Sequence, residues 1–235
     1  MLRLDLRCVW LAALVHFVGL PLLAEVDDAL LADGWREVTF DGKIANRFTP
    51  VDTDGISVES EGSVSLLEKS VTVDLEASPM LAWRWRVTMP APPTDLATKG
   101  EDDRSLALYV AFPFVPEEAG VMERLKRAVV ENLAGEEAPG RVLVCVWGGD
   151  GARGDRLQSP HLGDSGMMTI LRPTNTKPGV WFDETIDVAE DYRKAFASEP
   201  PDPMSLAIGA DTDDTMSKSR AVITDLAFVE RSKAF

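Results

Sequence analysis

The chain has few residues that could form a disulfide or bind zinc. Its 235 residues include two cysteines and two histidines, and Cys8 lies in an apolar segment at the N-terminus. Cys145 is therefore the one cysteine in the rest of the chain, which excludes an intramolecular disulfide there. It lies in the apolar run 141–147, where we expect a small core residue. His161 is isolated from other histidines and from cysteine, which argues against zinc and against a Cys/His nucleophile. We expect His161 to be a surface or turn residue.

Positive charge is also scarce. The chain has 24 Lys and Arg against 39 Asp and Glu, for a formal net charge of −15. Such an excess of negative charge repels nucleic acid and anionic membrane surfaces, so we expect neither as a partner. The same excess is compatible with a bound divalent cation, or with acidity that serves solubility alone.

Residues 1–24 have the pattern of a secretory signal peptide. Arg3 and Arg7 precede the apolar run 8–24, which ends in Ala24. An uncleaved membrane anchor is the alternative, because this run is close to the length that spans a bilayer. Under either interpretation, residues 25–235 are exported, to the periplasm or the extracellular space.

Short β-branched and aromatic runs, separated by Gly, Pro and Asp, dominate the exported part. They predict strands at 35–41, 56–60, 63–67, 71–75, 80–88, 106–112, 142–147, 167–171, 206–210 and 221–229. Without a regular alternation of strand and helix, this spacing predicts a single all-β domain over 25–235, an antiparallel β-sandwich of the jelly-roll type. An inserted amphipathic helix is expected from Pro116 to Gly135, and a short helix over 190–197.

Alternating tryptophan and arginine residues mark the strand expected at 80–88. Successive side chains of a strand point to opposite faces, so Trp83 and Trp85 share one face, which we expect to be buried. Arg84 and Arg86 then lie on the opposite face and are candidate ligand-binding residues. Tyr109 and Tyr192 are further ligand-binding candidates for a polar rim.

Carboxylates are concentrated at two places. Asp211, Asp213 and Asp214 fall within four residues and offer the oxygen ligands that calcium prefers, so they are candidate metal ligands. The alternative is a turn in which these carboxylates accept hydrogen bonds from backbone amides. Asp102 and Asp103 form the second group and are candidate ligand-binding residues, with a solvated loop as the alternative. To act as an acid/base couple, one of them would need a second carboxylate across the sheet, such as Asp211 or Asp213.

The glycine-rich segment 148–155 lacks the Lys followed by Ser or Thr that a phosphate-binding loop requires. We expect a hairpin or rim loop there instead.

Several ordered motifs carry a resemblance to a known family. They are residues 81–87, the acidic residues 101–103 before the strand with 109–112, residues 146–147, residues 187–192 with Phe196, and residues 210–215. Together they resemble the bacterial family called domain of unknown function 3047 over about residues 35–230. The resemblance implies an exported bacterial protein without implying an activity. Two positions depart from the pattern: Ala107 stands where an Arg is expected shortly before Tyr109, and Asp214 replaces an Asn.

The last third of the chain has a second likeness. Trp181, the Asp-Tyr segment, the Asp-rich loop and the closing strand with 224–228 are similar to the carbohydrate-binding jelly rolls of the galactose-binding-like type. This resemblance implies sugar docking on a concave sheet face or on loops.

These observations favour an exported, non-catalytic β-sandwich that binds a carbohydrate or another cell-envelope ligand through Arg84, Arg86 and the loop 211–215. One alternative is a polysaccharide-active hydrolase or lyase that uses Asp102 or Asp103 with His161 or Tyr109. The enzyme requires its acidic pair and an Arg or Tyr to converge, whereas the binding protein does not. A structural envelope subunit is the remaining alternative.

Overall fold

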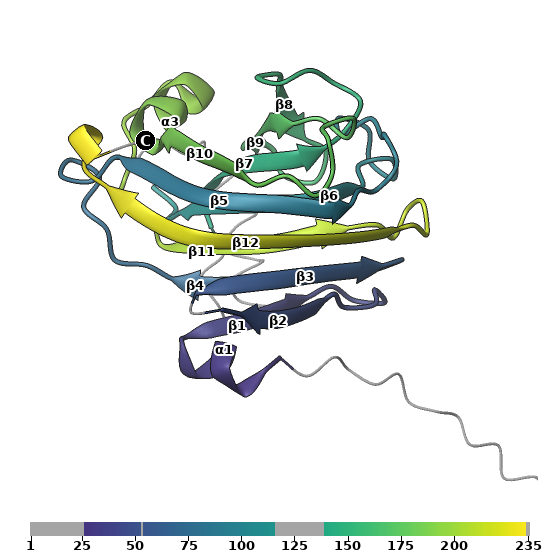
Figure 1. Ribbon diagram of the computed structural model, residues 1–235. Helices are drawn as coiled ribbons and strands as arrows, with labels where there is room; N and C mark the ends of the chain where they lie inside the picture. The colour runs from purple at the N-terminus through teal and green to yellow at the C-terminus, as the bar shows by residue number, and fades with distance from the viewer. Residues whose placement is uncertain (1–25, 53, 116–138, 234–235) are drawn as a thin grey trace, which may run out of the picture.

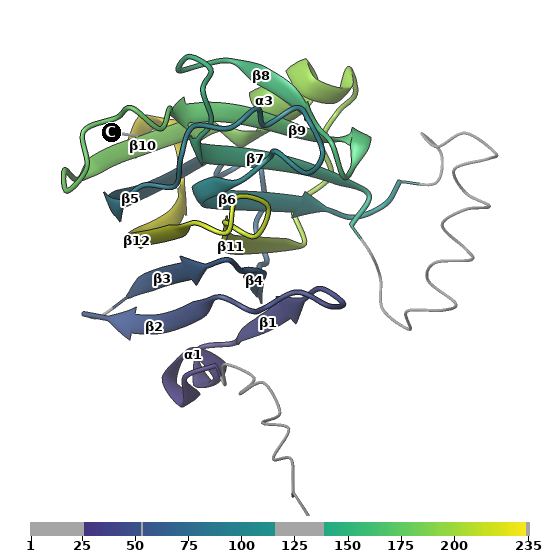
Figure 2. The same cartoon turned by 90° about the vertical axis from the view of Figure 1, so that its right-hand side faces the viewer.

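Two β-sheets pack face to face in the computed structural model, which describes residues 26–52, 54–115 and 139–233 (Figure 1; Figure 2). In spatial order, the seven-stranded sheet consists of β1 (Trp35–Thr39), β4 (Val64–Ser70), β11 (Ser205–Asp211), β6 (Arg104–Phe112), β7 (Arg141–Gly148), β9 (Gly163–Arg172) and β8 (Arg156–Ser159). The five-stranded sheet consists of β10 (Phe182–Asp187), β5 (Met80–Met89), β12 (Lys218–Val229), β3 (Gly55–Glu61) and β2 (Arg47–Val51). The predicted all-β sandwich is confirmed. One correction concerns strand direction: β7 and β9 pair in parallel, whereas the other paired strands of the described residues are antiparallel.

Helices are short in the described part of the chain: α1 (Asp28–Ala32), α3 (Val188–Phe196) and the 3-10 turn η1 (Arg231–Lys233). The expected helix at 190–197 is confirmed as α3, which begins after Asp187 because that side chain accepts a hydrogen bond from the Glu190 amide at 3.0 Å. It ends at Ala197, whose φ of 54° is left-handed. Among the described residues, no helix is long and apolar enough to cross a membrane. The expected signal peptide and amphipathic helix lie outside the described residues.

The strand expected at 71–75 is wrong. These residues form a connection with turns, and the Val71 amide donates to the Met204 carbonyl at 3.0 Å. Val71 and Val73 still pack against the core, so their alternation reflects burial without ladder pairing. Strands β2, β8 and β10 were not predicted from the sequence. β2 and β10 are the two edge strands of the five-stranded sheet, and β8 is an edge strand of the seven-stranded sheet.

The main core lies between the two sheets, and β5 contributes the largest side chains to it. Trp83 and Trp85 are fully buried with ring centroids 5.4 Å apart, so the expected buried tryptophan face is confirmed. Cys145 of β7 is a buried free cysteine in the same core, as expected, and burial raises the pKa of its thiol. A reactive thiol needs the thiolate, so this cysteine has a packing role.

A buried carboxylate joins the two sheets near β10. Glu184 is 4% exposed and accepts hydrogen bonds from the Trp85 indole at 3.2 Å and from Arg153 at 3.1 Å. Arg172 of β9 also donates to it, at 2.5 Å. Since β9 and β10 belong to different sheets, this ion-pair network holds the edges of the two sheets together.

The outer face of the seven-stranded sheet carries a second apolar cluster. On β6, Leu106 and Leu108 point into the core between the sheets, whereas Ala107 belongs to the cluster on the other face. Tyr109 is partly buried against this outer cluster. The alternation therefore places Tyr109 on the outer face, where the polar residues described next surround it.

Candidate functional site

Arg104, the first residue of β6, is the centre of a polar cluster. The pairing register of β6 with β7 shifts between Arg104 and Leu106, so a bulge at Ser105 turns Arg104 toward the same face as Tyr109. Gly148 of β7 lies opposite, and a Cβ there would come 2.9 Å from the Arg104 Cβ. The glycine thus allows β7 to approach the Arg104 backbone closely.

The guanidinium of Arg104 uses its N–H groups on neighbouring protein atoms. Its Nε and Nη2 both donate to the Tyr109 hydroxyl, at 3.2 and 3.0 Å. Its Nη1 donates to the carbonyl of Asp102 at 2.7 Å and to the carboxylate of Asp102 at 3.1 Å, and its Nη2 lies 3.4 Å from the carboxylate of Asp211. Burial alone would lower the pKa of Arg104, but Tyr109, Asp211 and Asp102 raise it overall. Arg104 therefore stays charged and organises its neighbours.

His161 joins the cluster from the turn between β8 and β9. Its Nε2 lies 3.1 and 3.2 Å from the two carboxylate oxygens of Asp102. The His161 side chain is 47% exposed and that of Asp102 is 2% exposed. The expected turn position of His161 is confirmed, and the buried carboxylate orients the imidazole at the surface.

Asp211, at the end of β11, is buried beside the same guanidinium. Burial raises its pKa to about 6 against the opposing effect of Arg104, and the nearby carboxylates of Asp103, Asp102 and Asp214 raise it further. Its Oδ2 lies near Arg104, while its Oδ1 has no hydrogen-bond partner among the described residues.

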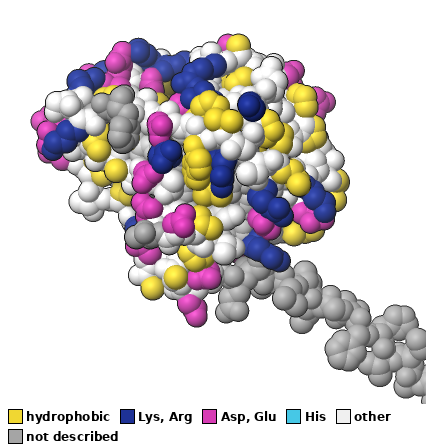
Figure 3. Space-filling view, viewed as in Figure 1, with side chains coloured by type: hydrophobic (Ala, Val, Ile, Leu, Met, Phe, Trp, Pro, Cys, Tyr) yellow, Lys and Arg dark blue, Asp and Glu magenta, His cyan; other side chains and the backbone are white. Residues whose placement is uncertain are grey.

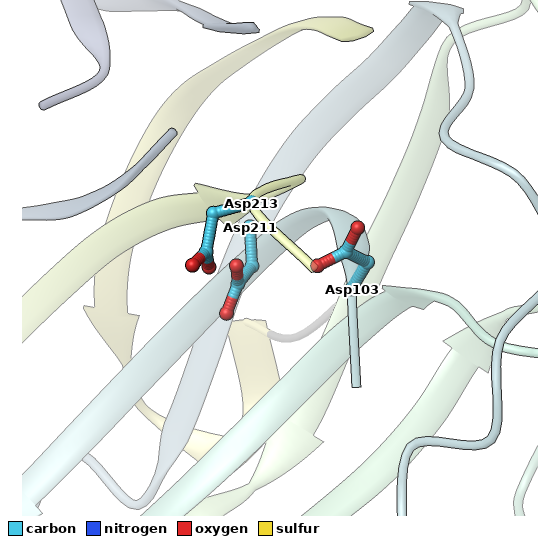
Figure 4. A group of neighbouring side chains, drawn as sticks. All are labelled: Asp103, Asp211 and Asp213. Carbon is cyan, nitrogen blue, oxygen red and sulfur yellow. The ribbon is translucent and has the colours of Figure 1, made fainter. Parts of the chain in front are cut away.

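Asp103 points away from Arg104 and holds the loop after β11. Its carboxylate accepts hydrogen bonds from the backbone amides of Asp214 at 3.2 Å and Thr215 at 2.9 Å, and from the Thr215 hydroxyl. The alternative expected for this loop was that its own carboxylates accept hydrogen bonds from backbone amides. In the structure, Asp103, which directly precedes β6, accepts those bonds. The carboxylates of Asp103, Asp211 and Asp213 converge, with one oxygen of each lying within 4.8 Å of the others (Figure 4). Asp214 is not part of this group.

Arg84 and Arg86 lie away from this cluster, on the outer face of the five-stranded sheet. Figure 3 shows this face, where Lys and Arg side chains lie among hydrophobic ones. Arg84 pairs with Asp183 at 2.6 Å, and the two guanidinium groups lie 5.5 and 4.6 Å from the centroid of the Trp181 ring. Since the buried core separates the two outer faces, these arginines do not form one site with Arg104 and its neighbours.

Tyr192, expected on a polar rim, is a core residue. It is 1% exposed, and its ring packs 4.6 Å from that of Phe112. Its hydroxyl accepts a hydrogen bond from Arg141 at 3.1 Å. The tyrosine lies on the inner face of α3, which explains why it is not available to a ligand.

Arg104 is the residue that the sequence analysis missed. The family resemblance predicted an Arg shortly before Tyr109, and the sequence has Ala107 in the expected place. In the structure, Arg104 makes the contact with Tyr109 from five residues away. The available sequence evidence was its position directly after Asp102 and Asp103, at the point where an apolar strand begins.

The cluster leaves two polar groups open to a ligand. The Tyr109 oxygen already accepts two hydrogen bonds, so its remaining capacity is to donate its own proton. His161 offers its exposed ring. In contrast, Asp102 and Asp103 are 1% and 0% exposed, and their side chains diverge toward different partners. They therefore lack the arrangement of a carboxylate pair that flanks a substrate.

The fold and this cluster define a two-sheet β-sandwich with a buried polar network under one outer face. The chain belongs to the family described as "Protein of unknown function (DUF3047)", whose model matches residues 33–227. No curated protein matches the chain. Among solved structures, it is similar to the xyloglucanase domain of NopAA, a type three effector from Sinorhizobium fredii, in complex with cellobiose. The sequence identity is 7%, the TM-score is 0.47, and the match covers 85% of this chain and 95% of that one.

Proposed function

We propose that this protein is an exported, non-catalytic β-sandwich that binds a carbohydrate of the cell envelope on the outer face of its seven-stranded sheet. The observation that carries the proposal is the fixed hydroxyl of Tyr109. Two N–H groups of Arg104 donate to its oxygen, at 3.2 and 3.0 Å, so the hydroxyl donates its own proton in a direction away from the guanidinium. A preoriented donor of this kind suits a sugar hydroxyl, because little entropy is lost when the hydrogen bond forms.

Tyr109 is the partly exposed residue among buried neighbours. Ala107 is 0% exposed, and the two residues that pair with Tyr109, Ala207 of β11 and Val144 of β7, are 7% and 3% exposed. The tyrosine ring itself therefore offers apolar area together with one polar atom. Export rests on the pattern of residues 1–24, with Arg3 and Arg7 ahead of an apolar run.

A glycan array with the purified protein tests the proposal. Tyr109→Phe removes only the hydroxyl, and we expect it to weaken binding about tenfold, which corresponds to roughly 1.4 kcal/mol. Tyr192→Phe is the matched control, because it removes a buried hydroxyl bonded to Arg141 near the other end of β6, and we expect unchanged affinity. A protein that retains no glycan, or equal affinity of wild type and Tyr109→Phe, would contradict the proposal.

Polysaccharide cleavage is the second candidate, and one observation favours it. Tyr109 and His161, both residues that can transfer protons, belong to one hydrogen-bonded cluster through Arg104 and Asp102. We expect no new reducing ends when the bound glycan is incubated with the protein. Their appearance, together with their loss in His161→Gln, would establish an enzyme instead of a binding protein.

A further inference from the structure

Three carboxylates at the end of the sandwich have no part in the proposed carbohydrate binding. Asp103 directly precedes β6, Asp211 is the last residue of β11, and Asp213 lies in the loop that follows β11. One oxygen of each lies within 4.8 Å of the others (Figure 4). Strands far apart in the sequence thus bring three negative charges into one small space.

A separate observation points to a ligand at these carboxylates. Asp211 is 6% exposed, and its Oδ1 is buried without a hydrogen-bond partner among the described residues. Buried polar atoms in folded proteins almost always have a partner, and those without a protein partner are commonly bound by a water or an ion. Arg104 approaches Oδ2 of the same carboxylate, which leaves Oδ1 for a second cation.

We propose that Asp103, Asp211 and Asp213 bind a divalent cation, and that the ion is calcium. Calcium takes carboxylate, carbonyl and water oxygens at ~2.3–2.6 Å, so two ligands on opposite sides of one ion are about 5 Å apart. The three oxygens, all within 4.8 Å of one another, lie inside that limit. Magnesium, at ~2.0–2.1 Å, prefers a strict octahedral shell rich in water, whereas calcium accepts an all-protein set of carboxylates, so magnesium is the comparison ion in the test. The ligand set differs from the three loop carboxylates expected from the sequence, because Asp103 takes the place of Asp214.

The charges already present can accommodate the ion. Lys43 pairs with Asp213, and its side chain is 43% exposed, so a bound cation can displace its ammonium group into solvent. Asp103 accepts its hydrogen bonds from Asp214 and Thr215, and a carboxylate has enough lone pairs to keep these bonds and bind a cation as well. Asp211 lies beside Arg104, which holds Tyr109, so the ion site adjoins the proposed carbohydrate site, but its test uses no glycan and can fail while glycan binding is retained.

Thermal unfolding of the full chain tests the calcium site with the metal alone. After treatment with a chelator, we expect added calcium at about 100 times its dissociation constant to raise the Tm by about 5 °C or more, and magnesium to raise it less. Asp211→Asn should abolish the calcium response. Asp214→Asn is the matched control, since its carboxylate lies in the same loop outside the group, and it should keep the response.

A second variant keeps the test decisive if Asp211→Asn fails to fold. Lys43→Gln removes the competing ammonium group from an exposed position, and we expect it to bind calcium more tightly than wild type does. No Tm shift in wild type at about 10 mM calcium would overturn the proposal, since extracellular calcium sites have dissociation constants of ~0.1–1 mM. Equal responses of Asp211→Asn and Asp214→Asn, or unchanged affinity in Lys43→Gln, would also overturn it.

Discussion

Replacement of Arg104 by Met is the sharpest test of the polar cluster. The side chain of Arg104 is 10% exposed, and those of its ion-pair partners Asp102 and Asp211 are 2% and 8% exposed. Without the guanidinium, these carboxylates are buried with no cation at their centre, and breaking a buried pair in this way costs ~3–5 kcal/mol. For a chain of this size, that loss lowers the Tm by roughly 6–20 °C.

The pH dependence of this loss separates a charge effect from a packing effect. Arg104 opposes the rise in the pKa of Asp211, so in Arg104→Met that pKa is higher still in the folded state, and the penalty is absent at low pH and grows as the pH rises. Urea unfolding from pH 4 to pH 8 should therefore show a small difference from wild type at pH 4 and a large one at pH 8. Arg84→Met is the control: Arg84 and Asp183 are 44% and 58% exposed, and an exposed pair contributes at most ~1 kcal/mol. A pH-independent loss in Arg104→Met, or a loss no larger than that of Arg84→Met, would show that uncompensated buried charge is not the cause of the destabilisation.

Three further predictions concern stability and are measured by urea unfolding. The pKa of Asp211 rises from 3.8 to about 6 on folding, so its protonated form contributes stability that is complete below about pH 4 and lost as the pH passes 6. In chelator, wild type should lose about 3 kcal/mol of this contribution by pH 7, and Asp211→Asn should not; identical pH profiles would contradict the assigned pKa. Glu184→Gln leaves Arg153 and Arg172 without their carboxylate and should cost ~1–3 kcal/mol, with unchanged stability as the contrary result. Gly209→Ala places a Cβ 2.7 Å from the backbone oxygen of Ser65 and should cost ~1–3 kcal/mol of unfolding free energy. An unchanged stability would contradict this expectation and would mean that β4 and β11 move apart without cost.

Sequence patterning predicted the central strands for two reasons: β6, β7 and β11 are apolar runs buried on both faces, and β5 has one apolar and one charged face. On β5, apolar and charged side chains alternate, and the structure buries Trp83 and Trp85 while Arg84 stays exposed. The strands that were missed lie at sheet edges, where one side of the backbone is open and burial is weaker. β2 contains Pro50, which an edge strand tolerates, and β8 is four residues long. The strand wrongly predicted at 71–75 has a different cause. Alternate side chains of a connection can also pack against the core although its backbone pairs with no strand.

The candidate site was harder to predict, because its residues come together through the pairing of strands that are distant in the sequence, and no local sequence pattern specifies that pairing. Asp102 and Tyr109 were selected as candidates, but the residue that connects them, Arg104, was not. Its orientation depends on the bulge at Ser105, which arises from the register of β6 against β7 and β11. Tyr192 was misjudged for a related reason: a tyrosine in a short helix looks the same in sequence whether the helix packs its face inward or outward.

The position of β12 has a consequence for biosynthesis. This last strand pairs with β3 on one side and with β5 on the other, in the middle of the five-stranded sheet. A ribosome adds ~5–20 residues per second, so several seconds pass between the synthesis of β5 and that of β12. During this time the backbone edges of β3 and β5 that pair with β12 remain unpaired. The five-stranded sheet can therefore close only after β12 has been synthesised, and β3 and β5 expose unpaired edges to other chains until then.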